Sequence, residues 1–349
     1  MNRPAQHHHP RSTSRSPWLA AFLVVSACAE PDPEEMTGDT TVGSNGASEA
    51  GDTSDSRSTE DGESSDGGGP GSGADTSTSG ADPTGSTGSG PAGDESSGST
   101  GEPGTGSPGC GLAPPGGDHF TIDVDGTTRE YYLDVPEGYD PEHPHMLVFA
   151  WHWLDGSALD VVNGSWASFG PYYGLEEQAD GAAIFVAPEG IDNGWSNPDG
   201  RDIDFALAMV SQLENELCID EARIVSTGFS FGGMMSNAVG CSLADTFRAI
   251  APMSGSLWSG CEAGGGPIAV WSAHGTNDGV VNINAGRQAR DEFLGRNGCT
   301  NESTPTGEGP CVSYEGCSEG HPVVWCEWNG DHIPPDFSPV GLWGFFASL

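Results

Sequence analysis

One short segment constrains the fold of this chain more than any other, because its pattern changes from strand to helix at a single serine. Residues 223–233 read RIVSTGFSFGG, and Ser230 stands at the centre of a G-x-S-x-G pattern. The β-branched residues before it predict a buried strand, and apolar residues at helical spacing after it predict a helix. Glycines on both sides permit a sharp corner on which the serine hydroxyl is free for chemistry.

The pattern alone is weak evidence in a chain so rich in glycine. The sequence holds 54 glycines in 349 residues, so about one G-x-S-x-G match is expected by chance. The hypothesis of a reactive serine therefore depends on whether the rest of the chain supplies a matching sheet, an acid and a base.

The amino terminus has the features of a bacterial export signal. Arginines without acidic residues precede an apolar run over residues 18–25, which is too short to span a membrane as a helix. The following Val-Ser-Ala-Cys resembles a lipobox, in which the cysteine becomes the lipidated first residue of the mature protein. We expect a lipoprotein signal peptide over residues 1–28, with lipidation at Cys28; an ordinary cleaved signal is the alternative.

Residues 29–109 are predicted to form a disordered acidic tether. They consist almost entirely of Gly, Ser, Thr, Asp, Glu and Pro, which bury too little apolar surface to offset the entropy of ordering. A flexible coil of this length spans roughly 50 Å. We expect it to hold a folded domain, residues 110–349, away from the membrane at the bacterial cell surface or in the periplasm, or to be released with that domain.

The charge of the chain limits its partners. The sequence has 51 acidic residues against 11 arginines and contains no lysine. A chain this acidic is repelled by nucleic acids and by anionic lipids. We therefore expect a neutral polymer or a small molecule as its ligand, and contact with a membrane only through the lipid anchor.

The cysteines of the predicted domain favour disulfides. Apart from Cys28 they are even in number, and an exported chain is exposed to oxidising conditions. The sequence has no C-x-x-C or H-E-x-x-H spacing, so we expect neither a metal site nor a cofactor. Eight cysteines allow 105 pairings, among which the sequence does not choose. The candidates are Cys110, Cys218, Cys241, Cys261, Cys299, Cys311, Cys317 and Cys326.

The pattern of residues 110–349 predicts a doubly wound α/β domain. Two alternating segments around Asp125-Gly126 predict an antiparallel hairpin. Short apolar segments then alternate with helical ones, as in a mostly parallel sheet covered by helices on both faces. The expected strands are residues 146–151, 182–187, 223–227, 247–252, 267–271 and 323–326. The expected helices are residues 172–179, 203–217, 233–243, 284–296 and 339–349.

The chain supplies an acid and a base in a suitable order. A serine hydroxyl becomes a nucleophile when a base takes its proton, and a carboxylate must orient that base. On sheets of this kind the order along the chain is serine, acid, histidine. Asp278 and His332 follow predicted strands in turn-rich loops after Ser230, where catalytic groups are expected. We therefore predict that these three residues are catalytic.

Other histidines compete with His332 for the role of base. His152 and His321 are the alternatives, but His332 comes latest in the chain and lies in a glycine-bearing loop. We expect His274, four residues before Asp278, to shape the acid's loop. The cysteine cluster from 299 to 326 is expected to pin the long loop before His332.

Attack of a serine hydroxyl on a carbonyl group also requires donors for the oxyanion of the tetrahedral intermediate. The backbone N–H of Phe231, directly after the nucleophile, is one expected donor. The second is expected from the loop after the strand at 146–151, with Trp153 or Leu154 as the alternatives.

Six stretches carry a family resemblance. They are LVFAWHWLDGSA at 147–158, NGWSN at 193–197, TGFSFGGMMS at 227–236, SLWSGC at 256–261, YEGCSEGHPVVWC at 314–326 and GDH at 330–332. In this order they resemble the secreted type C feruloyl esterases, relatives of acetyl xylan esterases and polyhydroxybutyrate depolymerases. The resemblance implies an α/β-hydrolase that releases ferulate or related hydroxycinnamates from plant cell-wall polysaccharide. It also implies the same Ser230, Asp278 and His332.

Aromatic residues in the predicted loops are the candidates for substrate contact. Trp195, Trp153 and Trp258 lie beside the expected strand ends, and flat rings suit a phenolic acyl group or the face of a sugar. We expect feruloylated polysaccharide or a small phenolic ester as substrate. An acetyl xylan esterase, a polyhydroxybutyrate depolymerase and a peptidase on the same scaffold are the alternative enzymes. A non-catalytic carbohydrate-binding lipoprotein is the alternative from another class.

Overall fold

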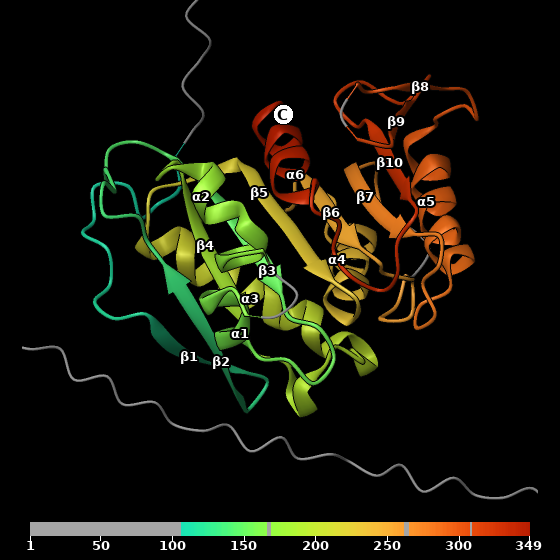
Figure 1. The fold of residues 1–349 in the computed structure, drawn as a ribbon. Coiled ribbons are helices and arrows are strands. Elements are labelled where there is room, and N and C mark those ends of the chain that lie inside the picture. Colours follow the sequence, from blue (N-terminus) through green and yellow to red (C-terminus); the bar gives the residue numbers. More distant parts are fainter. Residues whose placement is uncertain (1–105, 166–168, 262–264, 308) are drawn as a thin grey trace, which may run out of the picture. The chain divides into compact units, whose positions relative to one another are not determined.

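The described part of the chain is built on a ten-stranded sheet (Figure 1). The structure, a computed structural model, describes residues 106–165, 169–261, 265–307 and 309–349. The strands are β1 (His119–Val124), β2 (Thr127–Asp134), β3 (His145–Trp151), β4 (Ala183–Pro188), β5 (Ile219–Phe229), β6 (Ala249–Met253), β7 (Ala269–Gly275), β8 (Ser303–Pro305), β9 (Cys311–Tyr314) and β10 (Val323–Trp328).

The centre of the sheet is parallel and its two edges are antiparallel. The strand order is β1-β2-β4-β3-β5-β6-β7-β10-β9-β8. Strands β4, β3, β5, β6, β7 and β10 pair in parallel, whereas β1 and β2 at one edge and β9 and β8 at the other run antiparallel to their neighbours. Because the parallel strands share one direction, the loops at their carboxyl ends meet at one side of the domain.

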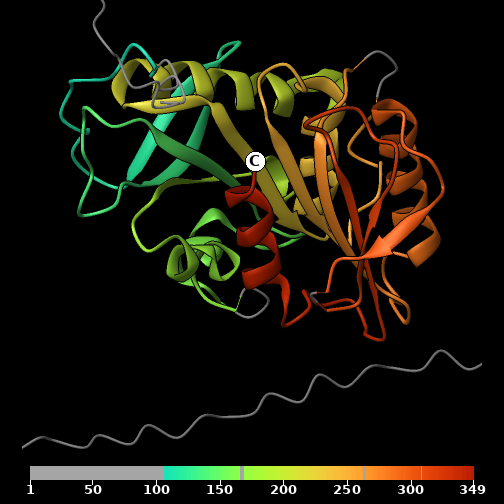
Figure 2. The same ribbon diagram turned by 90° about the horizontal axis from the view of Figure 1, so that it is seen from above.

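Helices cover both faces of the sheet (Figure 2). The α-helices are α1 (Ala158–Asn163), α2 (Leu175–Ala179), α3 (Arg201–Glu216), α4 (Phe231–Ser242), α5 (Ile283–Asn297) and α6 (Ser338–Ala347). The short 3₁₀ segments are η1 (Pro171–Gly174), η2 (Ile191–Asn193) and η3 (Pro198–Gly200). Buried side chains of α3, α4 and α5 join one core, and those of α1, α2 and α6 join the other.

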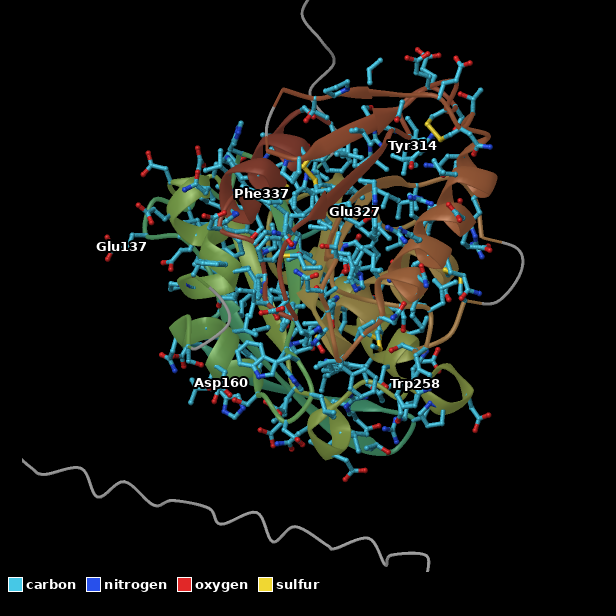
Figure 3. The ribbon with its side chains drawn as sticks, turned by 45° about the vertical axis from the view of Figure 1, so that its right-hand side comes forward. Glu137, Asp160, Trp258, Tyr314, Glu327 and Phe337 are labelled. Carbon is cyan, nitrogen blue, oxygen red and sulfur yellow. A yellow bond between two sulfur atoms is a disulfide. The ribbon has the colours of Figure 1, made fainter. Side chains whose placement is uncertain are left out.

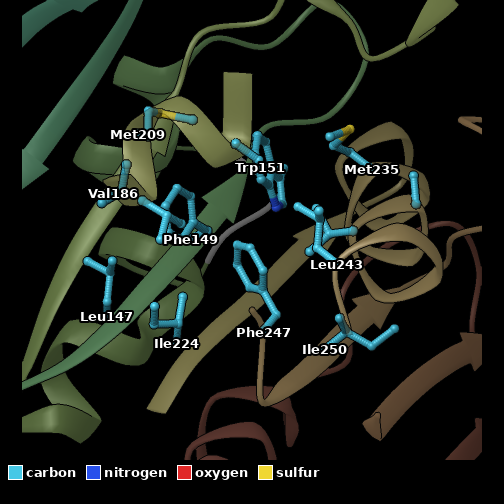
Figure 4. Close-up of a cluster of buried hydrophobic side chains, with 14 of the residues drawn as sticks. Leu147, Phe149, Trp151, Val186, Met209, Ile224, Met235, Leu243, Phe247 and Ile250 are labelled. Atoms are coloured by element: carbon cyan, nitrogen blue, oxygen red, sulfur yellow. The ribbon is translucent and has the colours of Figure 1, made fainter. Parts of the chain in front are cut away.

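Strand β3 shows how the sequence builds these two cores. Every residue of β3 is buried, and successive side chains of a strand point to opposite faces. Leu147 and Phe149 enter the core that Figure 4 shows, whereas Met146 and Val148 enter the other. A strand covered on both faces therefore needs a continuous apolar run, as this one has.

The predicted doubly wound α/β architecture is confirmed. The expected strands and helices are found with ends shifted by four residues or fewer. The helix expected from residue 172 begins at Leu175, because Tyr172 and Tyr173 take positive φ angles of 52° and 62° in η1. Helix α1 and the short strands β8 and β9 were not predicted.

All eight cysteines of the domain are paired, as expected, and the structure supplies the pairing. The disulfides are Cys110–Cys218, Cys241–Cys261, Cys299–Cys317 and Cys311–Cys326. Two of them lie in the segment between α5 and β10. Cys311–Cys326 joins β9 to β10, which is the strand that leads to His332.

The first described residues are fastened to the amino end of β5. Gly106 forms an isolated bridge with Asp220, and the Ser107 N–H donates to the Ile219 carbonyl at 2.9 Å. Residues 106–109 had been assigned to the tether, so these contacts extend the ordered chain four residues toward the amino terminus. The predicted signal peptide, Cys28 and the remainder of the tether lie outside the described residues.

None of the helices in the described ranges combines the length and the hydrophobicity that crossing a bilayer requires.

We predict that loss of the Cys110–Cys218 disulfide destabilises the domain more than loss of Cys299–Cys317. The paired cysteines are 108 and 18 residues apart. The loss of unfolded-chain entropy grows with loop length, to about 5 kcal/mol and about 3 kcal/mol respectively. Urea denaturation of the two double Cys→Ser variants measures this difference. Equal losses in unfolding free energy would contradict the prediction.

Candidate active site

Ser230 lies at the corner between β5 and α4. Its φ angle is 57° and its ψ angle is −117°, a backbone conformation that non-glycine residues rarely adopt. The corner is held by the Ser230 N–H, which donates to the Met253 carbonyl of β6 at 2.9 Å. The strand-turn-helix predicted from the G-x-S-x-G pattern is therefore present, with the serine at its tip.

The glycines on either side of Ser230 allow the backbone to approach closely. A Cβ atom on Gly228 would lie 2.5 Å from the backbone of Gly232. A Cβ atom on Gly232 would clash with the Trp151 carbonyl at the end of β3. Any side chain at either position would push α4 away from the sheet. The first turn of α4 consequently lies directly against the start of the loop that follows β3.

Three side chains from three loops meet at this corner. The His332 Nε2 lies 2.8 Å from the Ser230 Oγ, and the His332 Nδ1 lies 2.7 Å from the Asp278 Oδ2. An ionised carboxylate only accepts hydrogen bonds, so Nδ1 carries the proton and Nε2 is free to accept from the serine hydroxyl. This is the arrangement in which histidine can take the serine proton.

The acid is positioned by its own loop. Asp278 follows β7, and its Oδ1 accepts the backbone N–H groups of Val280 and Val281 at 2.9 and 2.8 Å. Its Oδ2 is thereby left facing His332. The Asp278 and Ser230 side chains are largely buried, which strengthens the electrostatic contact between the carboxylate and the imidazole.

The competing histidines lie elsewhere. His152 is fully buried behind the loop after β3, and His321 precedes β10, at the opposite end of that strand from His332. His274 is buried beside Asp278. Of these histidines, His332 is the one that hydrogen-bonds to Ser230.

The two regions expected to supply oxyanion donors lie side by side. Helix α4 begins at Phe231, and the first N–H groups of a helix have no acceptor within it. A Cβ on Gly194 would lie 2.7 Å from the Phe231 ring and 3.5 Å from the Leu154 side chain. The loop that holds Trp153 and Leu154 therefore borders the start of α4, and the assignment of the donors stays a prediction.

His152 supports this loop from inside. Its Nδ1 lies 2.7 Å from the Trp153 carbonyl, and its Nε2 lies 3.0 Å from the Gly190 N–H. Nδ1 must donate and Nε2 must accept, so the ring is neutral. Burial lowers the pKa of His152 to about 4, which agrees with that form. This support was not predicted, because its one signal in the sequence is a histidine directly after a buried strand.

Trp195 is not the substrate contact that the sequence suggested. It is completely buried, and its indole N–H donates to the His152 carbonyl at 2.8 Å. Its ring packs on those of Trp151 and His152 at centroid distances of 5.0 and 4.8 Å. Trp195 therefore braces the loop after β3 from behind rather than facing solvent.

Trp258 lies at the surface, as a substrate contact should (Figure 3). Two thirds of it, 66%, is exposed, and its ring lies 5.1 Å from that of Phe231, directly after the nucleophile. The neighbouring Ser259 hydroxyl donates to the Trp195 carbonyl at 2.7 Å, which ties this loop to the buried brace. The exposed side chains of Trp258 and Leu154 thus lie near the buried Phe231 ring, directly after Ser230.

The described ranges contain no cluster of three or more His, Cys, Asp or Glu side chains arranged to hold a metal ion.

Comparison with known proteins places these features in a family. The model of the prolyl oligopeptidase family matches residues 191–258. Feruloyl esterase C of Emericella nidulans is 43% identical over 231 residues, which are 63% of this chain and 84% of that protein. Feruloyl esterase D of Neurospora crassa is 38% identical over 257 residues, 68% of this chain and 89% of that protein.

A solved structure shares the fold. The acetyl xylan esterase from Aspergillus awamori superposes with a TM-score of 0.51 at 16% sequence identity, over 66% of this chain and 100% of the other. At this identity the likeness concerns the fold alone.

Acid should weaken the domain partly through His152. Burial lowers the pKa of this residue from 6.5 to about 4, so between those values the unfolded chain binds a proton that the folded chain does not. Stability therefore falls as the pH decreases through this window, by up to about 3 kcal/mol. We predict that His152→Gln loses this part of the acid dependence, measured as unfolding free energies at pH 7 and pH 4. An unchanged difference between the two pH values would refute the prediction.

Proposed function

This chain belongs to the family of the type C feruloyl esterases, and we propose that it hydrolyses hydroxycinnamate esters with Ser230 as the nucleophile. It is a carboxylic ester hydrolase with the α/β-hydrolase fold. The observation that carries the proposal is the continuous hydrogen-bonded path from the Ser230 Oγ through the His332 ring to the Asp278 carboxylate.

The proposed reaction begins with attack of the Ser230 Oγ on the ester carbonyl carbon. His332 Nε2 takes the hydroxyl proton as the bond forms, and Asp278 stabilises the resulting imidazolium. When the tetrahedral intermediate collapses, His332 gives this proton to the departing alcohol and an acyl-serine remains. Water then attacks the acyl group with His332 again as base, which releases the acid and restores Ser230.

The oxyanion of each tetrahedral intermediate needs donors that are already in place. We propose the Phe231 N–H as one donor, and the N–H of Leu154 or Trp153 as the other. The support for this assignment is the packing of both segments against Gly194. The buried His152 keeps the loop in one conformation, so the donors do not have to reorganise during the reaction.

We propose that the acyl group is aromatic and that it lies on the exposed apolar side chains of Trp258 and Leu154, beside the buried Phe231 ring. A planar hydroxycinnamoyl group can stack on rings of this kind. The similarity to the feruloyl esterase C of Emericella nidulans and the feruloyl esterase D of Neurospora crassa favours the same substrate class. The acidity of the chain favours a neutral feruloylated polysaccharide or a small phenolic ester.

We further propose that the enzyme is an exported lipoprotein anchored through Cys28. Four disulfides fit a protein that folds in an oxidising compartment. The signal-like segment and the lipobox in the sequence support export and lipidation respectively. The acidic segment up to the folded domain would then act as the tether.

Replacing the nucleophile tests the reaction. We predict that Ser230→Ala lowers kcat on methyl ferulate by at least about 10⁴-fold, because it removes the hydroxyl that is hydrogen-bonded to the His332 Nε2. The variant should also resist labelling by a fluorophosphonate and should unfold at the same urea concentration as the wild type. Ser348→Ala, at the end of α6, is the matched control and should keep full activity. A labelled, active Ser230→Ala protein would rule the proposal out.

Replacing the exposed tryptophan tests the substrate class. We predict that Trp258→Ala lowers kcat/KM on methyl ferulate by about 10-fold, since an aromatic stacking contact is worth about 1 kcal/mol beyond its buried area. Activity on p-nitrophenyl acetate should change little, because an acetyl group does not reach the ring. Val340→Ala, an exposed apolar position on α6, is the control. Higher wild-type activity on acetyl or hydroxybutyrate esters than on cinnamoyl esters would favour the alternative esterases.

A further inference from the structure

His274 is a buried histidine that the proposed mechanism does not use. It lies near the end of β7, four residues before Asp278, and is 1% exposed. A buried polar ring needs partners for its nitrogen atoms. The partners of His274 show which of its atoms carries a proton.

The Nε2 atom of His274 is a hydrogen-bond donor. It lies 2.8 Å from the Val281 carbonyl oxygen, which can only accept. The same Nε2 lies 3.3 Å from the Asp278 Oδ2. That oxygen also accepts the hydrogen bond from the His332 Nδ1 at 2.7 Å. The Asp278 Oδ2 therefore accepts its hydrogen bond from His332 and also lies beside the His274 Nε2, whose hydrogen bond goes to Val281.

The His274 ring is fixed in place and electrically neutral. A Cβ on Gly286 of α5 would clash with its Nδ1, so the backbone of that helix lies directly against the ring. Trp325 of β10 covers it at a centroid distance of 6.3 Å. Burial lowers the pKa of His274, although the nearby charges of Asp278 and Glu327 oppose this effect and His332 adds to it.

We propose that His274 is a positioning residue of the catalytic acid, which holds the Asp278 Oδ2 in line with the His332 Nδ1. This inference rests on the proposed function of Ser230, His332 and Asp278. The backbone N–H groups of Val280 and Val281 fix Oδ1. The carboxylate can still pivot about Oδ1, which would displace Oδ2. The neutral His274 ring, whose Nε2 lies 3.3 Å from Oδ2, opposes this movement without placing a second positive charge beside the imidazolium.

The sharpest test compares two amide side chains at position 274. The amide nitrogen of glutamine can reach the place of Nε2, whereas that of the shorter asparagine cannot. We expect His274→Asn to lower kcat on methyl ferulate by about 100-fold, since a displacement of about 1 Å at a catalytic group has that effect. KM should stay unchanged, and His274→Gln should recover most of the lost kcat. Equal kcat values in the two variants, whether high or low, would overturn the proposal.

A second pair of variants leaves His274 unchanged and adds a methyl group to α5, the helix that lies against its ring. Gly286→Ala introduces the methyl group that clashes with Nδ1, and alanine favours a helix more than glycine does. Gly295→Ala lies on the same helix where a Cβ meets no atom within 4 Å. We expect a loss of kcat without a change in KM for Gly286→Ala alone. Equal kcat values in these two variants would also overturn the proposal.

A spectroscopic signature separates this proposal from the proposed function. The proton shared by the His332 Nδ1 and Asp278 gives a low-field ¹H NMR resonance that can be observed without any substrate. It should persist in His274→Gln and disappear in His274→Asn, and its persistence in both would count against His274. A wild-type protein that shows the resonance but hydrolyses no ester would contradict the proposed function and leave the positioning role intact.

Discussion

The close approach of α4 to the end of β3 is the contact on which the site depends. Two glycines, Gly228 and Gly232, leave room for this approach, and Ser230 takes a positive φ between them. The same contact brings the first N–H groups of α4 beside the loop after β3. The nucleophile and the expected oxyanion donors thus receive their relative positions from one packing interaction, so a single added methyl group would disturb both.

Two buried histidines support the site, one in the loop after β3 and one beside the acid. His152 holds the loop after β3 with one donating and one accepting nitrogen, and His274 donates next to the acid. A positive charge on His274 would introduce a like charge near the imidazolium that the proposed mechanism forms on His332. Burial therefore has a second effect besides packing. It keeps the rings of His152 and His274 neutral, so that His332 is the ring among the three that gains a proton during the proposed reaction.

The sequence was sufficient for the architecture and for the residues that meet at Ser230, because apolar periodicity and motif order are local signals. It was not sufficient for the burial of single side chains or for the pairing of the cysteines, because these depend on contacts between elements that are distant in the sequence. Trp195 and Trp258 both stand in turn-rich loops, yet one is buried and the other exposed. The pairing of cysteines depends on distances that no spacing reveals. The four residues of β9 were missed because a strand so short has no readable period.

Strand β5 separates the point where the chain enters the domain from the nucleophile. The first described residues bridge to Asp220 at the start of this strand, and Ser230 directly follows its last residue. Eleven residues of extended chain separate these ends by about 35 Å. Any support that holds the protein by its amino terminus is thus joined on the side remote from the nucleophile.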